Sequence, residues 1–337
     1  MIAGQRERAI PLHPEHLVAP SSVTHDYSVF GGNLRSEIPF PELVAAVCDR
    51  PDWTFRIARG APAAVRLERI GERQLGPETY RLFRTSSGLR LEYSHAGLFD
   101  ISNDGTSIVW YHRPDAHPEL VRSIVLGSAL ALALELKGML CLHGSAVALG
   151  RGSRAIAFLG PKYHGKSTLA TALTAAGARL IGDDLLAITP GPPTTVRPGV
   201  ASVRLWSDTA RALSVDTLCA RVIHGVKTTA TAFSERALVR GVAPLSAVYV
   251  LDPVGTGGEQ AAGRRERLGG VAAAIALAHQ TKLPGTLVGL HAAGSQLAAA
   301  AAVAATVPVW TLRAVRDFSV LPALVEQILE WHQEDTL

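Results

Sequence analysis

A lysine, a hydroxyl side chain and two glycines occur at fixed spacing in residues 160–168, which have the sequence GPKYHGKST. They match the pattern G-x-x-x-x-G-K-[ST], in which backbone N–H groups surround a phosphate, the lysine reaches the outer phosphates and the hydroxyl ligates Mg²⁺. An apolar strand candidate, 155–159, precedes the pattern, and apolar residues at helical spacing follow it as far as Gly177. We therefore predict a loop that binds ATP and Mg²⁺ at a helix N-terminus. Its residues are Gly160, His164, Gly165, Lys166, Ser167 and Thr168.

Two adjacent carboxylates, Asp183 and Asp184, end the strand predicted over 178–182. A helix of about 11 residues and a strand of about five residues both span about 16 Å, so the chain returns to the level of the loop. A right-handed strand–helix–strand crossover would place the aspartates beside the loop. One carboxylate can then hold Mg²⁺ while the other takes a proton from an attacking hydroxyl, although two acids in a turn are otherwise plain solvated charge.

Three segments together resemble the catalytic core of HPr kinase/phosphorylase, a bacterial protein-serine kinase. They are residues 142–147 (LHGSAV), the phosphate loop, and residues 180–184 (LIGDD). In that family a histidine lies on the strand before the loop and paired aspartates follow the loop helix. The resemblance covers residues 138–190 and implies an α/β fold with a P-loop core of the HPr kinase/PEP carboxykinase-like type. It implies that the catalytic residues are Asp183, Asp184, His143 and Lys166, with Ser167 and Asp184 on the metal; which aspartate is the base stays open.

More loosely, the chain resembles HPr-kinase-like proteins found beside peptide-modification genes, including those of lasso peptides. This likeness lies in residues 198–208 (PGVASVRLWSD), the region of Lys227, and residues 30–34 and 38–43 near the N-terminus. Two departures from the family stand out. Tyr163 and His164 replace a small residue or glycine of the loop, and the acidic–arginine signature that serves the reverse reaction is missing. We therefore do not expect phosphorylase activity.

Several candidates have an ordinary alternative beside the functional one. His143 can tune proton transfer or be a satisfied core histidine. Tyr163 can shield the nucleotide or pack outward, and His164 can donate to a phosphate. Arg204 and Asp208 can line the acceptor site or form a packed turn, while Lys227 can act as a lid charge on the transferring phosphoryl group or be a solvated lysine.

Composition is that of a cytoplasmic enzyme. The 337 residues are 47% hydrophobic and 18% charged, with a net charge of +4. The mild basic balance favours a nucleotide or an acidic peptide over duplex nucleic acid, although a generally arginine-rich composition explains it equally well. Three scattered cysteines indicate thiols in a reducing compartment. The N-terminus does not have the apolar core of a signal peptide, and Glu135 and Lys137 interrupt the longest apolar stretch, so no membrane contact is expected.

The chain divides into three parts on pattern. Residues 1–24 are a loose N-terminal segment, 25–113 a smaller β-rich domain and 114–337 the catalytic domain. In the second part, strand candidates at 53–57, 80–84, 89–93 and 107–111 indicate an antiparallel sheet of modest size. Its edges, with 89–93 as one of them, can bind an extended peptide or merely support the core.

In the third part, helices are predicted over 118–138, from Ser207, over 271–280, 296–304 and 321–331. Strands are predicted over 245–251 and 307–312, and a surface loop over 255–267.

These features predict an ATP- and Mg²⁺-dependent kinase that phosphorylates a hydroxyl, most simply a serine of a small peptide or protein such as a lasso-type precursor. Two alternatives remain: a kinase of a free hydroxylated small molecule, and a non-catalytic ATP-binding accessory protein. No nucleic-acid partner is expected, and a homo-oligomer is compatible with the sequence. The acceptor, the reversibility and the nucleotide preference are not determined by the sequence.

Overall fold

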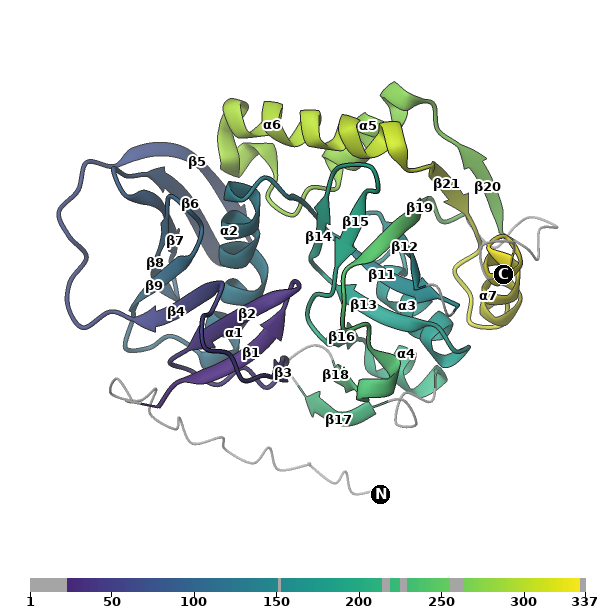
Figure 1. Cartoon of the computed structure of the whole chain (residues 1–337), viewed down its shortest axis with the longest axis horizontal. Coiled ribbons are helices and arrows are strands. Elements are labelled where there is room, and N and C mark those ends of the chain that lie inside the picture. The colour runs from purple at the N-terminus through teal and green to yellow at the C-terminus, as the bar shows by residue number, and fades with distance from the viewer. Residues whose placement is uncertain (1–22, 151–152, 214–218, 225–228, 255–262, 334–337) are drawn as a thin grey trace, which may run out of the picture.

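The computed structural model describes residues 23–150, 153–213, 219–224, 229–254 and 263–333. Two nine-stranded sheets lie side by side, and a three-stranded sheet lies below the second one (Figure 1). The mixed α/β class predicted from the sequence is confirmed. The N-terminal segment 1–24 falls almost entirely outside the described residues.

The first sheet has the strand order β3-β1-β2-β4-β9-β8-β7-β6-β5. Its strands are β1 (His25–Val29), β2 (Gly32–Ser36), β3 (Val44–Ala45), β4 (Trp53–Ile57), β5 (Glu68–Leu75), β6 (Glu78–Arg84), β7 (Gly88–Tyr93), β8 (Gly97–Ser102) and β9 (Ser107–His112). The prediction of a modest antiparallel sheet is wrong in size and direction, because β4 pairs in parallel with both β2 and β9. Alternation of apolar residues reveals a strand but not its direction. Strand 89–93 is also no edge, since β7 lies between β6 and β8.

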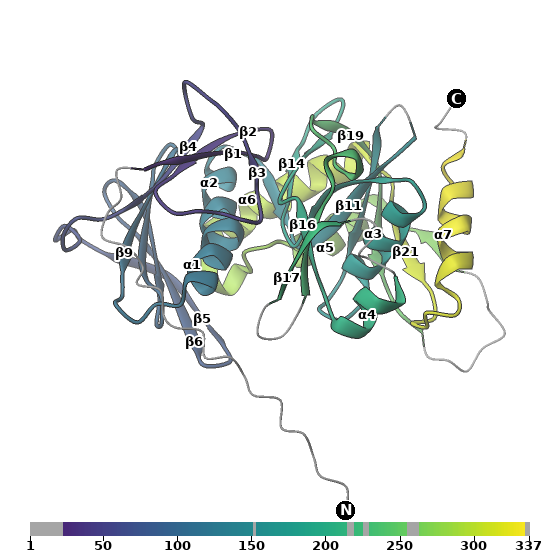
Figure 2. The ribbon, with the colours of Figure 1, turned by 90° about the horizontal axis from the view of Figure 1, so that it is seen from below.

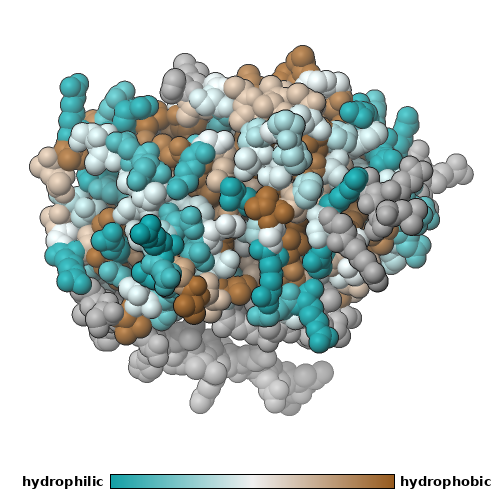
Figure 3. All heavy atoms as spheres, in the orientation of Figure 1, coloured by the Kyte–Doolittle hydropathy of each residue, from teal (hydrophilic) through white to brown (hydrophobic). Residues whose placement is uncertain are grey.

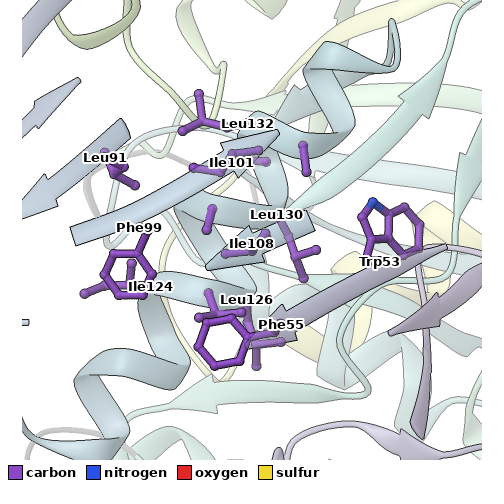
Figure 4. Close-up of a cluster of buried hydrophobic side chains, with 14 of the residues drawn as sticks. Trp53, Phe55, Leu91, Phe99, Ile101, Ile108, Ile124, Leu126, Leu130 and Leu132 are labelled. Carbon is purple, nitrogen blue, oxygen red and sulfur yellow. The ribbon is translucent and has the colours of Figure 1, made fainter. Parts of the chain in front are cut away.

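A long helical segment packs against this sheet. The helix predicted over 118–138 is formed by α1 (Pro118–Ile124), a π-helical turn η1 (Val125–Ala129) and α2 (Leu130–Leu136). Alternate side chains of the strands, such as Phe55, Phe99 and Ile108, meet Ile124 and Leu130 in one buried cluster (Figure 4). The segment that follows residue 113 is therefore packed on the first sheet before the chain enters the second.

The second sheet carries the phosphate loop. Its order is β10-β14-β15-β19-β12-β11-β13, with β21 beside β19 and β20 beside β21. The strands are β10 (Leu140–Leu142), β11 (Gly144–Leu149), β12 (Arg154–Leu159), β13 (Arg179–Asp183), β14 (Leu186–Thr189), β15 (Thr195–Arg197), β19 (Ala243–Leu251), β20 (Arg264–Arg267) and β21 (Val309–Arg313). The expected neighbour of β12 was β13, but β11 lies between them and pairs antiparallel with both. The hairpin that precedes the loop thus inserts a strand into the crossover.

Helices cover both faces of this sheet. The loop helix α3 (Lys166–Ala175) and α7 (Leu321–Glu330) share one apolar cluster with Phe158 and Tyr249. On the other face, α5 (Gly270–His279) and α6 (Gly285–Thr306) pack on alanines of β11 and β12. The helix predicted over 296–304 is the second half of α6. The loop predicted over 255–267 is wrong at its end, where β20 pairs with β21.

The remaining elements form a small layer beside the loop helix. The third sheet has the order β16-β18-β17, with β16 (Ser202–Leu205), β17 (Cys219–His224) and β18 (Thr229–Phe233). The helix predicted from Ser207 is α4 (Ser207–Ala212). A 3₁₀ turn, η3 (Glu235–Ala237), leads toward β19.

Several contacts join the first sheet to the half of the chain that follows it. The Phe30 N–H donates to the Pro198 carbonyl at 2.6 Å, so the turn after β1 lies on the segment that precedes β16. The start of α6 contributes Leu287 and Val288 to the cluster of the first sheet. In Figure 2, α6 lies behind the region where the two halves meet. Among the described residues, no helix is both long and apolar enough to cross a membrane.

Candidate active site

The loop between β12 and α3 has the backbone that its glycines allow. Gly160 has a φ of 142° and Gly165 a φ of 90°, a region that side chains disfavour. A Cβ at Gly160 would also lie only 3.2 Å from the Leu251 carbonyl oxygen. Gly165 is the N-cap of α3, so the first N–H groups of the helix point into the loop. The predicted order of strand, glycine loop and helix is present.

Lys166 closes the loop from within. Its Nζ donates to the carbonyl oxygens of Gly160 at 2.8 Å and Pro161 at 3.0 Å. The residue is 7% exposed, and this burial lowers the pKa of the ammonium, while the charges of Asp183 and Asp184 act in the opposite direction. The ammonium therefore lies in a confined space that two carboxylates share.

Asp183 is buried against two hydroxyl groups. Ser145 on β11 and Ser167 on α3 both donate to its Oδ1, at 2.5 and 2.8 Å, and the Arg204 N–H lies 3.4 Å from its Oδ2. The residue is 6% exposed. Burial raises the pKa of Asp183, although the hydrogen bonds from Ser145, Ser167 and Arg204 act to lower it. The structure thus joins Asp183 directly to the hydroxyl of the phosphate loop. Ser145 belongs to the LHGSAV segment, but its spacing alone did not mark it.

Asp184 lies between two basic side chains. His143 Nδ1 is 3.1 Å from both the carbonyl oxygen and Oδ1 of Asp184, and since both atoms are acceptors, Nδ1 is the protonated nitrogen. Lys282 Nζ is 2.7 Å from Oδ2. The Asp184 backbone has a φ of 71°, which turns the carboxylate toward these partners. Partial burial alone would raise the pKa of Asp184, but Lys282 and His143 hold it well below its usual range.

Lys282 was missed by sequence reasoning. It lies in the five-residue connection between α5 and α6, about 100 positions from the aspartates. The connection is fastened to β10, because the Lys282 N–H donates to the Cys141 carbonyl at 2.8 Å and the His143 N–H to the Gln280 carbonyl at 2.7 Å. A lone lysine between two helices gives no local signal, so only the tertiary structure reveals it.

An aromatic pair lies beside the loop. Tyr163 (54% exposed) stacks on Trp206, with ring centroids 6.0 Å apart, and Lys162 Nζ lies 5.1 Å from the Tyr163 centroid. The pair borders a cavity of about 240 Å³ that reaches from Gly165 and Thr168 to α7. Its other walls are apolar side chains and the segment after β21, and they include Leu251, Pro253, Leu312, Val315, Phe318 and Leu321. Tyr163 therefore packs outward from the loop, onto Trp206.

The other candidates lie around this cavity or away from it. Asp208 lines the cavity, and its Oδ1 accepts the Thr209 N–H at 2.7 Å. His164 also lines it, and its Nδ1 is 3.1 Å from the Leu251 carbonyl, which ties the loop to β19. Arg204 contacts Asp183 through its backbone N–H, and its side chain is exposed. Lys227 lies outside the described residues.

The residues present fit a magnesium ion. Mg²⁺ takes one or two protein oxygens and completes its shell with water and phosphate oxygens, so it needs no dense ligand cluster. Ser167 Oγ and Asp183 Oδ1 already lie 2.8 Å apart at the mouth of the loop. In the part of the chain that is described, no group of three or more His, Cys, Asp or Glu side chains is placed to hold a metal ion. Ser167 and Asp183 are the residues that would hold such an ion, since Asp183 rather than Asp184 lies against the serine.

Comparison with known proteins adds little. No protein-family model and no curated protein matches the chain. Among solved structures it is similar to the Hpr(Ser) kinase/phosphatase from Coxiella burnetii, at 13% identity and a TM-score of 0.31, over 58% of this chain and 97% of that one. A likeness at this TM-score carries no conclusion about fold or activity, so membership of that family stays a prediction.

Proposed function

We propose that this protein is an ATP- and Mg²⁺-dependent phosphotransferase that moves the γ-phosphoryl group to a hydroxyl acceptor. The observation that carries the proposal is the contact between Ser167 and Asp183 within a loop that already holds Lys166. Cation, hydroxyl and carboxylate at this spacing are the parts that phosphoryl transfer needs. A chance match to the glycine pattern would not bring a carboxylate from another strand to the serine.

The two aspartates have different surroundings, which supports a division of roles. Asp183 is the residue that would hold Mg²⁺ with Ser167, since its oxygens face the loop and are shielded from solvent. Bound there, Mg²⁺ would neutralise charge on the phosphate oxygens. The Asp184 side chain is 44% exposed and faces His143 and Lys282, so it is the carboxylate that an incoming hydroxyl can reach.

In the transfer step, the acceptor oxygen forms a bond to the γ-phosphorus while the bond to the β–γ bridging oxygen breaks. ADP leaves with that electron pair, and the hydroxyl proton passes to the Asp184 carboxylate. His143, protonated at Nδ1, keeps the carboxylate oriented. This arrangement replaces the sequence-based assignment of Asp184 to the metal with an assignment of Asp183.

The cavity beside the loop suits the nucleoside. It begins at Thr168, one turn into α3, and it is walled by apolar and aromatic groups. A base that left the loop along α3 would meet Trp206 and Phe318, whose rings are 43% and 44% exposed. Base–aromatic stacking tolerates any base, so this cavity supports nucleotide binding without fixing the nucleotide.

The acceptor is proposed to be a serine of a small peptide or protein, of the lasso-precursor kind. The first sheet offers two edges, β3 with two residues and β5, against which α6 packs. A peptide bound by strand addition would use one of these edges rather than β7. Recognition by the first sheet stays a proposal.

Transfer of label from [γ-³²P]ATP to a library of serine, threonine and tyrosine peptides tests the function. We expect Mg²⁺-dependent labelling of serine peptides and none of the matched alanine peptides. Labelling of free hydroxylated compounds alone would favour the small-molecule kinase. ATP binding without transfer or hydrolysis would favour the accessory protein and contradict the proposal.

A further inference from the structure

The ammonium of Lys282 is largely withdrawn from solvent, which is unusual for a lysine. The side chain is 15% exposed, and its Nζ reaches Asp184 at 2.7 Å. A lysine normally keeps its ammonium in water, and withdrawing it is unfavourable unless the surroundings compensate. The segment that presents it must therefore be rigid enough to keep the ammonium in this position.

Three anchors fix that segment. The Lys282 N–H is bound to the Cys141 carbonyl at 2.8 Å, and the Gln280 carbonyl accepts the His143 N–H at 2.7 Å. Gln296 of α6 donates to the Leu283 carbonyl at 3.0 Å. The stem of Lys282 also passes close to Gly127 of η1, where an added Cβ would lie 3.6 Å from Cε. The ammonium is thus built into the site by β10, η1 and α6.

The Lys282 charge acts on the same space as Lys166. Its Nζ is bound to Asp184 at 2.7 Å, and the neighbouring Asp183 accepts the hydroxyl of Ser167, the residue after Lys166, at 2.8 Å. Two cations and two carboxylates therefore share one compartment beside the loop. The Asp184 side chain is partly exposed, so a phosphoryl group can approach it. The oxygens of that group could then accept the hydrogen bond that the Lys282 ammonium now donates to Asp184.

We propose that Lys282 binds the γ-phosphoryl group of the nucleotide and is a further catalytic residue of this site. The inference rests on the proposed function. Lys166 contacts the phosphates from the loop, and Lys282 contacts the terminal group from the connection between α5 and α6. Lys282 keeps its proton throughout and supplies charge as the β–γ bond breaks. It fills the role for which the sequence offered Lys227.

A binding experiment separates this role from a structural one. ADP and the uncleaved analogue AMP-PNP differ at the γ-phosphoryl position, so a residue that contacts this group affects only the second. We expect Lys282→Met to weaken AMP-PNP binding about 10-fold to 100-fold, the usual size for a charge-assisted hydrogen bond, and to leave ADP binding unchanged. Isothermal titration in the presence of Mg²⁺ measures both affinities. Lys282→Arg should keep the preference for AMP-PNP.

Lys137→Met is the matched control, because Lys137 is an exposed lysine at the end of α2. It should alter neither affinity. Equal weakening of ADP and AMP-PNP by Lys282→Met, or no weakening of either, would overturn the proposal. If Lys282→Met does not fold, the double variant Asp184→Asn/Lys282→Met is used, because it removes both charges of the pair. Its ratio of AMP-PNP affinity to ADP affinity is compared with the same ratio for Asp184→Asn. An unchanged ratio would again overturn it.

The outcome also distinguishes this inference from the proposed function. If the parent protein binds nucleotide and Lys166→Ala weakens ADP and AMP-PNP alike, the phosphate site stands, whatever Lys282→Met shows. A parent protein that binds neither nucleotide would overturn both claims.

Discussion

The two large sheets of this protein have different interiors. The first is filled with large rings, and Trp110 stacks between Phe55 and Phe99 at centroid distances of 6.4 and 6.1 Å. The central strands of the second sheet bury small residues, such as Ala146 and Ala157. Buried polar residues of this half, among them Ser145 and Lys166, lie at the phosphate loop with Asp183. The first sheet is thus built for packing, and the second accommodates close helices and a polar site.

The surface does not repeat this contrast. Hydrophobic and hydrophilic side chains are intermixed over the face shown in Figure 3, above both halves of the molecule. Partly exposed charges on the first sheet form ion pairs, as Arg81 of β6 does with Glu72 of β5 at 2.6 Å. The two sheets therefore differ in their interiors and not on their surfaces. Substitutions inside the first sheet should affect stability, and substitutions around Asp183 in the second should affect activity.

The largest expected effect is that of Lys166→Ala, which should reduce ATP turnover to background. The substitution removes the cation from the outer phosphates in a confined site, where such charges contribute several kcal/mol. A coupled phosphate-release assay measures it, and the melting temperature serves as the control for folding. Near-normal turnover would show that Lys166 does not act in catalysis. It would also contradict the view that the chemistry of this protein lies at the second sheet.

Asp184→Asn should come next, with a fall in kcat of about 10²- to 10⁴-fold, the usual contribution of a general base. Nucleotide affinity should change little, because Asp184 faces the acceptor side. Steady-state kinetics and a titration with nucleotide measure the two quantities on one preparation. A loss of affinity as large as the loss of kcat would assign Asp184 to nucleotide binding instead.

In the first sheet, Trp110→Ala should destabilise the fold by about 3–5 kcal/mol, the usual loss for a large buried ring. The free energy of unfolding in urea measures it, and Val47→Ala, at a fully exposed position, is the control. Where the variant is still folded, its affinity for ATP should equal that of the parent. A specific loss of ATP affinity would show that the two sheets are not independent.

A smaller effect is expected from Glu135 at the end of α2. Burial raises the pKa of this carboxyl from 4.5 to about 8, although Gln296 donates to it at 3.1 Å, and Arg84 lines the same pocket. The folded chain therefore binds this proton more tightly than the unfolded chain does, and its contribution to stability is lost as the pH rises toward 8. Melting temperatures between pH 5 and pH 9 should fall less steeply for Glu135→Gln than for the parent. The exposed Glu330→Gln serves as control, and parallel curves for all three proteins would refute the assignment.

Local signals predicted much of the half of the chain that contains the phosphate loop. The phosphate loop, α3, β13, α4, α5, β21 and α7 lie within two residues of their predicted places. The start of β21 differs by two residues. These elements have short-range causes, such as glycines at required turns and helical spacing of apolar residues. The pairing of Ser167 with Asp183 also follows the crossover argument, although β11 lies between the two strands.

Long-range features could not be predicted. The parallel pairing of β4, the position of β7 inside its sheet and the contact of Lys282 with Asp184 depend on how distant segments pack. Alternation of apolar residues is the same for a central and an edge strand exposed on one face. A lysine between two helices has no periodic partner, so sequence reasoning placed the extra cation at Lys227 instead.

The central claim is that Ser167 and Asp183 form the metal end of the phosphate site and that Asp184 faces the acceptor. Its most direct test is the gain in ATP affinity on adding Mg²⁺, measured by titration calorimetry for the parent, Ser167→Ala, Asp183→Asn and Asp184→Asn. We expect this gain to be lost in Asp183→Asn, reduced in Ser167→Ala and retained in Asp184→Asn. A gain retained in Asp183→Asn and lost in Asp184→Asn would contradict the claim.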